Sequence, residues 1–234
     1  MVGGALRRRP SKRASPGGGA LLTCAATVVL ATVLAGTAGG AEATHATPAG
    51  TALAQHDLLS RADLGRGWTD TAAPKKVPAL TCPRFSPALR GVVQTGAAIS
   101  PTFQRSATGP FVSQTGYAYA SGAEASAVWH AVARPHLLRC VAESLARGST
   151  DGVQFAVTGK RLLTPPSVSV RAAGYRVTGT ATVPYQTVNV YLDVLLLGAG
   201  DSVTELSISS FLEPPSRALE RRLAKTVAGR IAAG

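Results

Sequence analysis

The chain contains few of the residue types that usually take part in catalysis. It contains 3 cysteines, 4 histidines and 12 acidic residues among 234, and aromatic residues make up 5% of the composition. Neither a G-x-S-x-G elbow nor an H-E-x-x-H helix occurs in the sequence. No motif for a nucleophile, a metal or a carboxylate pair is therefore recognisable, and hydrolysis by one of these motif-bearing families is not indicated.

Long apolar runs are also missing, apart from one near the N-terminus. Five basic residues between Arg7 and Arg13 precede the uncharged run Leu21–Leu34, and small residues follow around Ala41–Ala43. This order is typical of an export signal, and the run is shorter than the roughly 20 residues of a membrane-spanning helix. The expected division is a signal peptide at 1–43, a flexible spacer at 44–50 and one domain at 51–234.

Export places the domain in a secreted or extracytoplasmic envelope location. The alternative is an N-terminal segment that stays uncleaved as a membrane anchor, because the uncharged stretch continues through several glycines to Ala41. Contact with a membrane is expected only in that case.

Two cysteines remain once Cys24 leaves with the signal. Cys82 and Cys140 form an even pair in an oxidising compartment, so we predict a disulfide between them. The alternative is a metal site that uses His136 and Cys140, which are four residues apart on one helix face. It lacks a third ligand at a recognisable spacing, so neither a metal nor a cofactor is expected.

Basic residues outnumber acidic ones, and the formal net charge is +12. An exported protein does not normally meet nucleic acid, so the expected counterparts of this charge are anionic envelope polymers or lipid head groups. A local cluster lies near the C-terminus, and its simplest interpretation is a solvated helix face. Its members are Arg217, Arg221, Arg222, Lys225 and Arg230.

Hydrophobic periodicity predicts a mixture of helices and strands. Alternation with a period of two predicts a strand at 111–119, two long strands joined at Pro184–Tyr185, and a further strand after Gly198–Asp201. Shorter candidates are 153–157, 161–163 and 168–172, with a bulge or bend at Ala173–Gly174. Spacings of three and four predict helices before Gly65, on both sides of Pro135, and after Ser216. Loops and short pieces of secondary structure are expected from Pro74 to Pro110, a segment that contains Cys82.

Adjacent antiparallel strands with one-sided apolar patterning predict the α+β class. The expected architecture is a twisted antiparallel β-sheet with helices packed on one face. Thr178, Thr180 and Thr182 would lie on the opposite face, which would be polar and open to water.

Asp193 is the most interesting acidic residue, because it lies inside a predicted strand near Tyr191. With Arg176 these residues form a candidate ligand cleft on the polar face. The alternative is that Asp193 faces water or pairs with a strand neighbour such as Arg176. No catalytic residue is assigned. Trp68 and Trp129 are expected in the core rather than as stacking platforms for a ligand.

The order of these features resembles the extracellular sensor domains of actinobacterial Ser/Thr protein kinases, the PknH-like family, and related secreted sensor-like domains. The matching pieces are the segment Leu58–Thr69, a proline-flanked Cys82, the strand before Gly122, and the helix carrying Trp129 and Cys140. The resemblance implies an antiparallel sheet with helices on one side and a cleft for an unidentified ligand, and nothing catalytic. Members often carry two disulfides and a Trp close to a Cys, whereas here one pair remains.

The sequence thus supports two functional hypotheses. The first is an exported, non-catalytic envelope protein with a sensor-like domain that binds a small molecule or lipid. The alternative is a secreted hydrolase that acts on envelope polymers, with site residues too dispersed for a motif.

Overall fold

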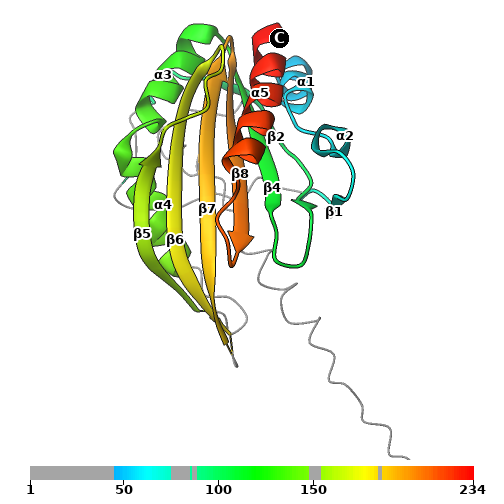
Figure 1. Cartoon of the computed structure of the whole chain (residues 1–234). Coiled ribbons are helices and arrows are strands. Elements are labelled where there is room, and N and C mark those ends of the chain that lie inside the picture. The colour runs from blue at the N-terminus through cyan, green and yellow to red at the C-terminus, as the bar shows by residue number, and fades with distance from the viewer. Residues whose placement is uncertain (1–44, 75–84, 86–88, 148–153, 184–185) are drawn as a thin grey trace, which may run out of the picture.

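A computed structural model describes residues 45–74, 85, 89–147, 154–183 and 186–234, and its centre is an eight-stranded antiparallel sheet (Figure 1). The strand order is β1-β3-β4-β8-β7-β6-β5, and β2 pairs with β4 beside β3. The strands are β1 (Thr69–Asp70), β2 (Gln94–Ile99), β3 (Phe103–Gln104), β4 (Phe111–Tyr119), β5 (Gln154–Leu163), β6 (Arg171–Val183), β7 (Gln186–Ala199) and β8 (Ser202–Phe211). The helices are α1 (Pro48–His56), α2 (Arg61–Leu64), α3 (Gly122–Val132), α4 (Pro135–Arg147) and α5 (Arg217–Ala233). The α+β class and the antiparallel sheet are confirmed.

The chain from Phe111 onward follows the periodicity closely. β4, β7 and β8 occupy the predicted strands, and Gly200 at φ 48° makes the turn between the last two. α3 ends at Val132 and α4 begins at Pro135, as expected for a proline that cannot continue a helix. Ser216 accepts a hydrogen bond from the Leu219 N–H and caps α5.

Other boundaries differ from the sequence-based prediction. The two short candidates at 153–163 form one strand, β5, with its irregularity between Val157 and Gly159. The prediction of a bulge at Ala173–Gly174 is wrong, because the pairing register between β6 and β7 continues through these two residues without a shift. A Cβ at Gly174 would lie 3.0 Å from the Leu163 Cβ, so close strand packing explains this glycine. In the segment 74–110, β2 and β3 are the short pieces of secondary structure that the sequence led us to expect.

The expected spacer is also shorter than predicted, because α1 already begins at Pro48. Thr47 caps the helix by accepting from the Gly50 N–H at 2.9 Å, and Pro48 stands in the first turn. Gly50 packs directly against β2, where an added Cβ would lie 2.4 Å from the Thr95 carbonyl oxygen. The predicted signal peptide lies outside the described residues.

Helices cover both faces of the sheet, and this corrects the expectation of a single covered face. Figure 1 shows α5 on the opposite side of the sheet from α3 and α4. On β7, Leu192 and Leu196 join the core beneath α3 and α4, while Leu195 and Leu197 join the core beneath α5. The apolar run Val194–Leu197 is the physical reason, because a strand with consecutive apolar residues is buried on both sides. On the face that α5 covers, Thr178 and Thr180 of β6 are half-buried and Thr182 is exposed.

Candidate functional site

The predicted cleft residues Arg176 and Asp193 are directly opposite each other in the β6–β7 register. The Arg176 guanidinium donates two hydrogen bonds to the Asp193 carboxylate, from Nε to Oδ1 and from Nη2 to Oδ2, each at 2.5 Å. This bidentate geometry is the strongest form of an arginine–carboxylate contact. Tyr191 lies two register positions away, opposite Thr178 and on the same face of the sheet, and is half-buried. The structure therefore brings the three residues together, and it shows the pairing that was one of the two interpretations of Asp193.

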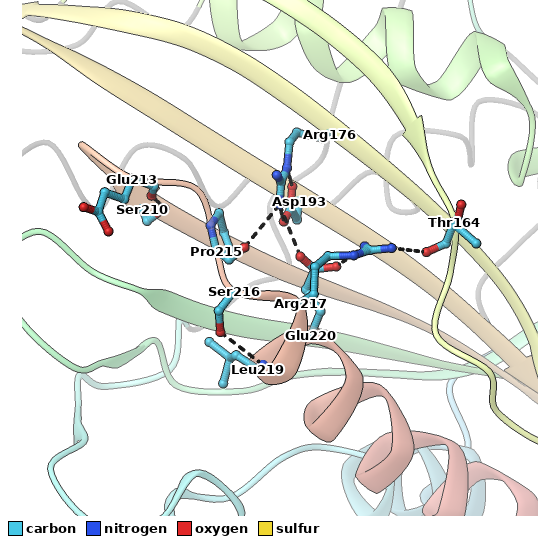
Figure 2. Close-up of polar contacts among 10 residues, drawn as sticks. All are labelled: Thr164, Arg176, Asp193, Ser210, Glu213, Pro215, Ser216, Arg217, Leu219 and Glu220. Carbon is cyan, nitrogen blue, oxygen red and sulfur yellow. Dashed lines mark hydrogen bonds and ion pairs between the residues drawn. The ribbon is translucent and has the colours of Figure 1, made fainter.

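The N-terminal end of α5 encloses this pair (Figure 2). Arg176 Nη2 also donates to Glu220 Oε1 at 3.2 Å and to the Pro215 carbonyl oxygen at 3.3 Å. Arg217 donates to the other oxygen of Glu220. Arg176, Asp193, Arg217 and Glu220 form what we call the ion cluster. Asp193 and Glu220 are fully buried, and Arg176 is 5% exposed.

The charges of the ion cluster balance, with two guanidinium groups against two carboxyl groups. Burial, followed by the charge of Asp193, raises the pKa of Glu220. The hydrogen bond to Asp193 is the main cause that raises the pKa of Arg176. Because the carboxyl groups are enclosed and engaged, the cluster holds α5 against the sheet and offers no free group to a ligand.

Open space begins next to the ion cluster. A cavity of about 450 Å³, which we call the α5 cavity, lies between the β3–β4 connection and the β8–α5 connection. Residues 108–110 line one side and residues 210–216 the other, and Arg105 and Leu219 complete the lining. Pro215 belongs to both features, since its carbonyl oxygen accepts from Arg176 and the residue lines the cavity.

The rim of the α5 cavity carries an unusual backbone conformation. Leu212 has a φ of 72°, the left-handed region that a leucine rarely adopts, and its side chain is 55% exposed. Its N–H donates to the Asn189 carbonyl oxygen at 3.0 Å, and Ser210 Oγ donates to the Glu213 carbonyl oxygen at 2.5 Å. These bonds hold the connection between β8 and α5 in a defined shape.

Sequence reasoning missed Glu220 and the α5 cavity. The apolar stripe of α5 was recognised, but Glu220 lies in a second buried row with Ala224 and Ala228. A search for a charged residue at the edge of a wide helical stripe would have found it. No comparable signal marks the cavity, because its lining comes from two connections that are about 100 residues apart in the chain.

The remaining candidates are mostly core residues. Trp68 is 5% exposed and lies beneath α5. Trp129 packs against the core beneath α3 and α4, and the guanidinium carbon of Arg171 lies 5.8 Å from its ring centroid. Cys140 is buried at 3% and His136 is exposed. Within the described ranges, no three His, Cys, Asp or Glu side chains gather as a metal site would require. Cys82 lies outside the described residues, so its bridge to Cys140 stays a prediction.

The sequence comparisons assign no family to this chain. The chain matches no protein-family model and no curated protein sequence. The resemblance to PknH-like sensor domains therefore stays a prediction from the residues that carry it. Over the part of the chain that the structure describes, no helix has the length and apolar composition that crossing a membrane requires.

Proposed function

We propose that this protein is an exported, non-catalytic domain that binds a small ligand in the α5 cavity. The cavity is the observation that carries the proposal. Its volume of about 450 Å³ lies in the range of small-molecule sites, and apolar and hydroxyl side chains line it together. The sequence of residues 1–43, which has the order of an export signal, supports the location.

The distribution of ionisable groups favours binding over hydrolysis. Among the described lining residues of the cavity, the ionisable side chains are Arg105 and Glu213. Asp193 and Glu220 lie nearby, but Arg176 and Arg217 occupy their oxygens. A hydrolase would need an acid, base or nucleophile that is free to reach a substrate.

The left-handed Leu212 supports the same proposal. A non-glycine residue in this region costs about 1–3 kcal/mol, and such residues gather at ligand sites and switches. Here the residue stands on the cavity rim and turns a large apolar side chain toward solvent. A ligand with an apolar part would cover this side chain when it enters.

The test is to fill the cavity and follow the ligand. Thr108 is half-buried in the lining, so Thr108→Trp would occupy the space without disturbing the core. The matched control is Thr69→Trp, an exposed threonine outside the lining. Both variants and the wild type would be purified from the exporting host and examined by native mass spectrometry.

We expect a co-purifying molecule on the wild type and on Thr69→Trp, and its loss from Thr108→Trp. Absence of any bound molecule from all three proteins, or equal retention by both variants, would contradict the proposal. Unfolding curves of the variants distinguish a filled cavity from a misfolded domain.

A further inference from the structure

A second concave surface lies on the other flank of α5. Its volume is about 370 Å³, and we call it the basic groove. One wall is the segment Thr164–Ser167, which follows β5, and the other is the exposed side of α5 with Arg217, Arg221 and Lys225. The basic groove shares no residue with the α5 cavity, so a ligand can bind in it whether or not the α5 cavity has the proposed function.

The structure divides the C-terminal basic cluster into two groups. Arg222 donates to the carbonyl oxygens of Asp63 and Leu64, and Arg230 binds the Asp63 carboxylate at 2.8 Å. These two arginines therefore fasten α2 to α5, and Arg217 is bound to Glu220. Within the described part of the chain, Arg221 and Lys225 have no hydrogen-bond or ion-pair partner.

The wall opposite these two cations is held in place. Arg217 Nη2 donates to the Thr164 carbonyl oxygen at 2.6 Å, and this contact joins the wall to the first turn of α5 (Figure 2). Pro165 and Pro166 follow, and their rings fix the backbone φ angles of the wall. The groove is thus formed before any ligand arrives, which lowers the entropic cost of binding.

The free cations form a short row along the helix. Arg221 and Lys225 are one i, i+4 step apart, which is a rise of about 6 Å along a helix axis. The guanidinium of Arg221 can donate two parallel hydrogen bonds to a phosphate or carboxylate, and the ammonium of Lys225 acts as a point charge. Such a row suits a linear chain whose negative groups repeat at a similar spacing.

A flat membrane surface fits this groove less well. A helix that lies on a bilayer presents apolar side chains beside its cations. Here the apolar stripe of α5, which includes Leu219 and Leu223, is buried in the core. Leu162 and Leu212, the exposed large hydrophobic residues of the described chain, do not line the groove.

We propose that the basic groove binds a linear polyanion, a polymer with phosphate or carboxylate groups, through Arg221 and Lys225. Arg217 is a positioning residue that holds the groove wall. Such polymers are among the anionic components that an exported basic protein can meet in a cell envelope.

The experiment measures binding of three probes to the full chain by fluorescence anisotropy and sedimentation. Inorganic polyphosphate represents phosphate polymers, poly-glutamate represents carboxylate polymers, and vesicles with and without phosphatidylglycerol represent a membrane. The double variant Arg221→Gln/Lys225→Gln removes both free cations. The matched control Arg139→Gln/Lys160→Gln removes one arginine and one lysine that are also exposed, on α4 and on the edge strand β5.

We expect one or both polymers to bind, and the double variant to bind about tenfold more weakly at low salt while the control does not change. The slope of log affinity against log salt should decrease in magnitude by about 1.4 for two lost contacts. Equal binding by both double variants, or binding to anionic vesicles alone, would overturn the proposal. The single variant Lys225→Gln provides a second measurement should the double variant fail to fold.

Discussion

The two helical layers are attached to the same sheet by different kinds of contact. α4 contributes Leu137 and Val141 to a hydrophobic cluster that includes Leu192 of the sheet. α5 also buries an apolar stripe, but Glu220 in its first turn reaches Arg176 of the sheet as well. Hydrogen-bonded ions require one geometry, whereas apolar side chains accept many. We infer that the ion cluster fixes the position of α5, and both concave surfaces beside that helix depend on this position.

The largest expected effect comes from removing one carboxylate of the ion cluster. Asp193→Ala would leave Arg176 buried with Glu220 as its remaining acidic partner. Breaking a buried pair on one side typically costs about 3–5 kcal/mol of unfolding free energy. Chemical denaturation would measure the loss.

The matched control replaces both partners, as Arg176→Leu/Asp193→Leu. Two apolar residues leave no uncompensated charge between the strands, so this variant should recover much of the lost stability. A loss below about 1 kcal/mol for Asp193→Ala would mean that the cluster is not what secures α5.

A second prediction compares the two faces through neighbouring residues of β7. Leu196 lies beneath α3 and α4, Leu197 lies beneath α5, and both are 0% exposed. Alanine at either position should cost about 2–5 kcal/mol in urea denaturation, because each leaves a cavity in a packed core. The control Leu162→Ala removes a side chain that is 58% exposed and should change stability by no more than about 0.5 kcal/mol. A small effect at Leu197 alone would show that the α5 layer is loosely packed.

The smallest effect is a difference in pH dependence. Burial, then the charge of Asp193, raises the pKa of Glu220 above its ordinary value of 4.5, so the folded protein holds this proton more tightly than the unfolded chain. The resulting contribution to stability is fully present below pH 4.5 and is lost as the pH rises through the raised pKa. The wild type should therefore lose stability relative to Glu220→Gln as the pH rises through that range, which denaturation curves at several pH values would measure.

Asp63 provides a comparison of opposite sign. Partial burial favours a higher pKa, but hydrogen bonds from Ser60 and Arg230 outweigh it and lower the pKa of Asp63 below 3.8. Its contribution is present above that value and is lost as the pH falls. Parallel pH profiles for the wild type and Glu220→Gln, with a visible effect for Asp63→Asn, would show that Glu220 titrates as it does in the unfolded chain.

Periodicity along the chain was enough to predict most of the secondary structure. A strand repeats every two residues and a helix every 3.6, so β4, β7, β8 and α5 could be predicted from their apolar positions. The start of α1 was missed because its first turn, which contains Ala49 and Gly50, has no large apolar residue that marks a repeat. Thr47 and Pro48 carry the local signal, and the close approach to Thr95 of β2 secures it.

The candidate site was predictable only in part. The pairing of Arg176 with Asp193 could be considered, since adjacent antiparallel strands bring residues of matching register together. Glu220 is more than 25 residues further along the chain and meets the pair only because α5 folds back over the sheet. Whether a polar strand face is open or covered depends on where α5 folds back over the sheet. The local sequence pattern of a strand holds no information about that position.

The amino-acid sequence by itself determined the class of the fold and the positions of most elements, because hydrophobic spacing and capping residues act locally. The tertiary structure decided which face α5 covers, which charges are buried, and where concave surfaces remain. The physical reason is that burial depends on what packs above a residue, and for the ion cluster, the α5 cavity and the basic groove that cover comes from distant parts of the chain.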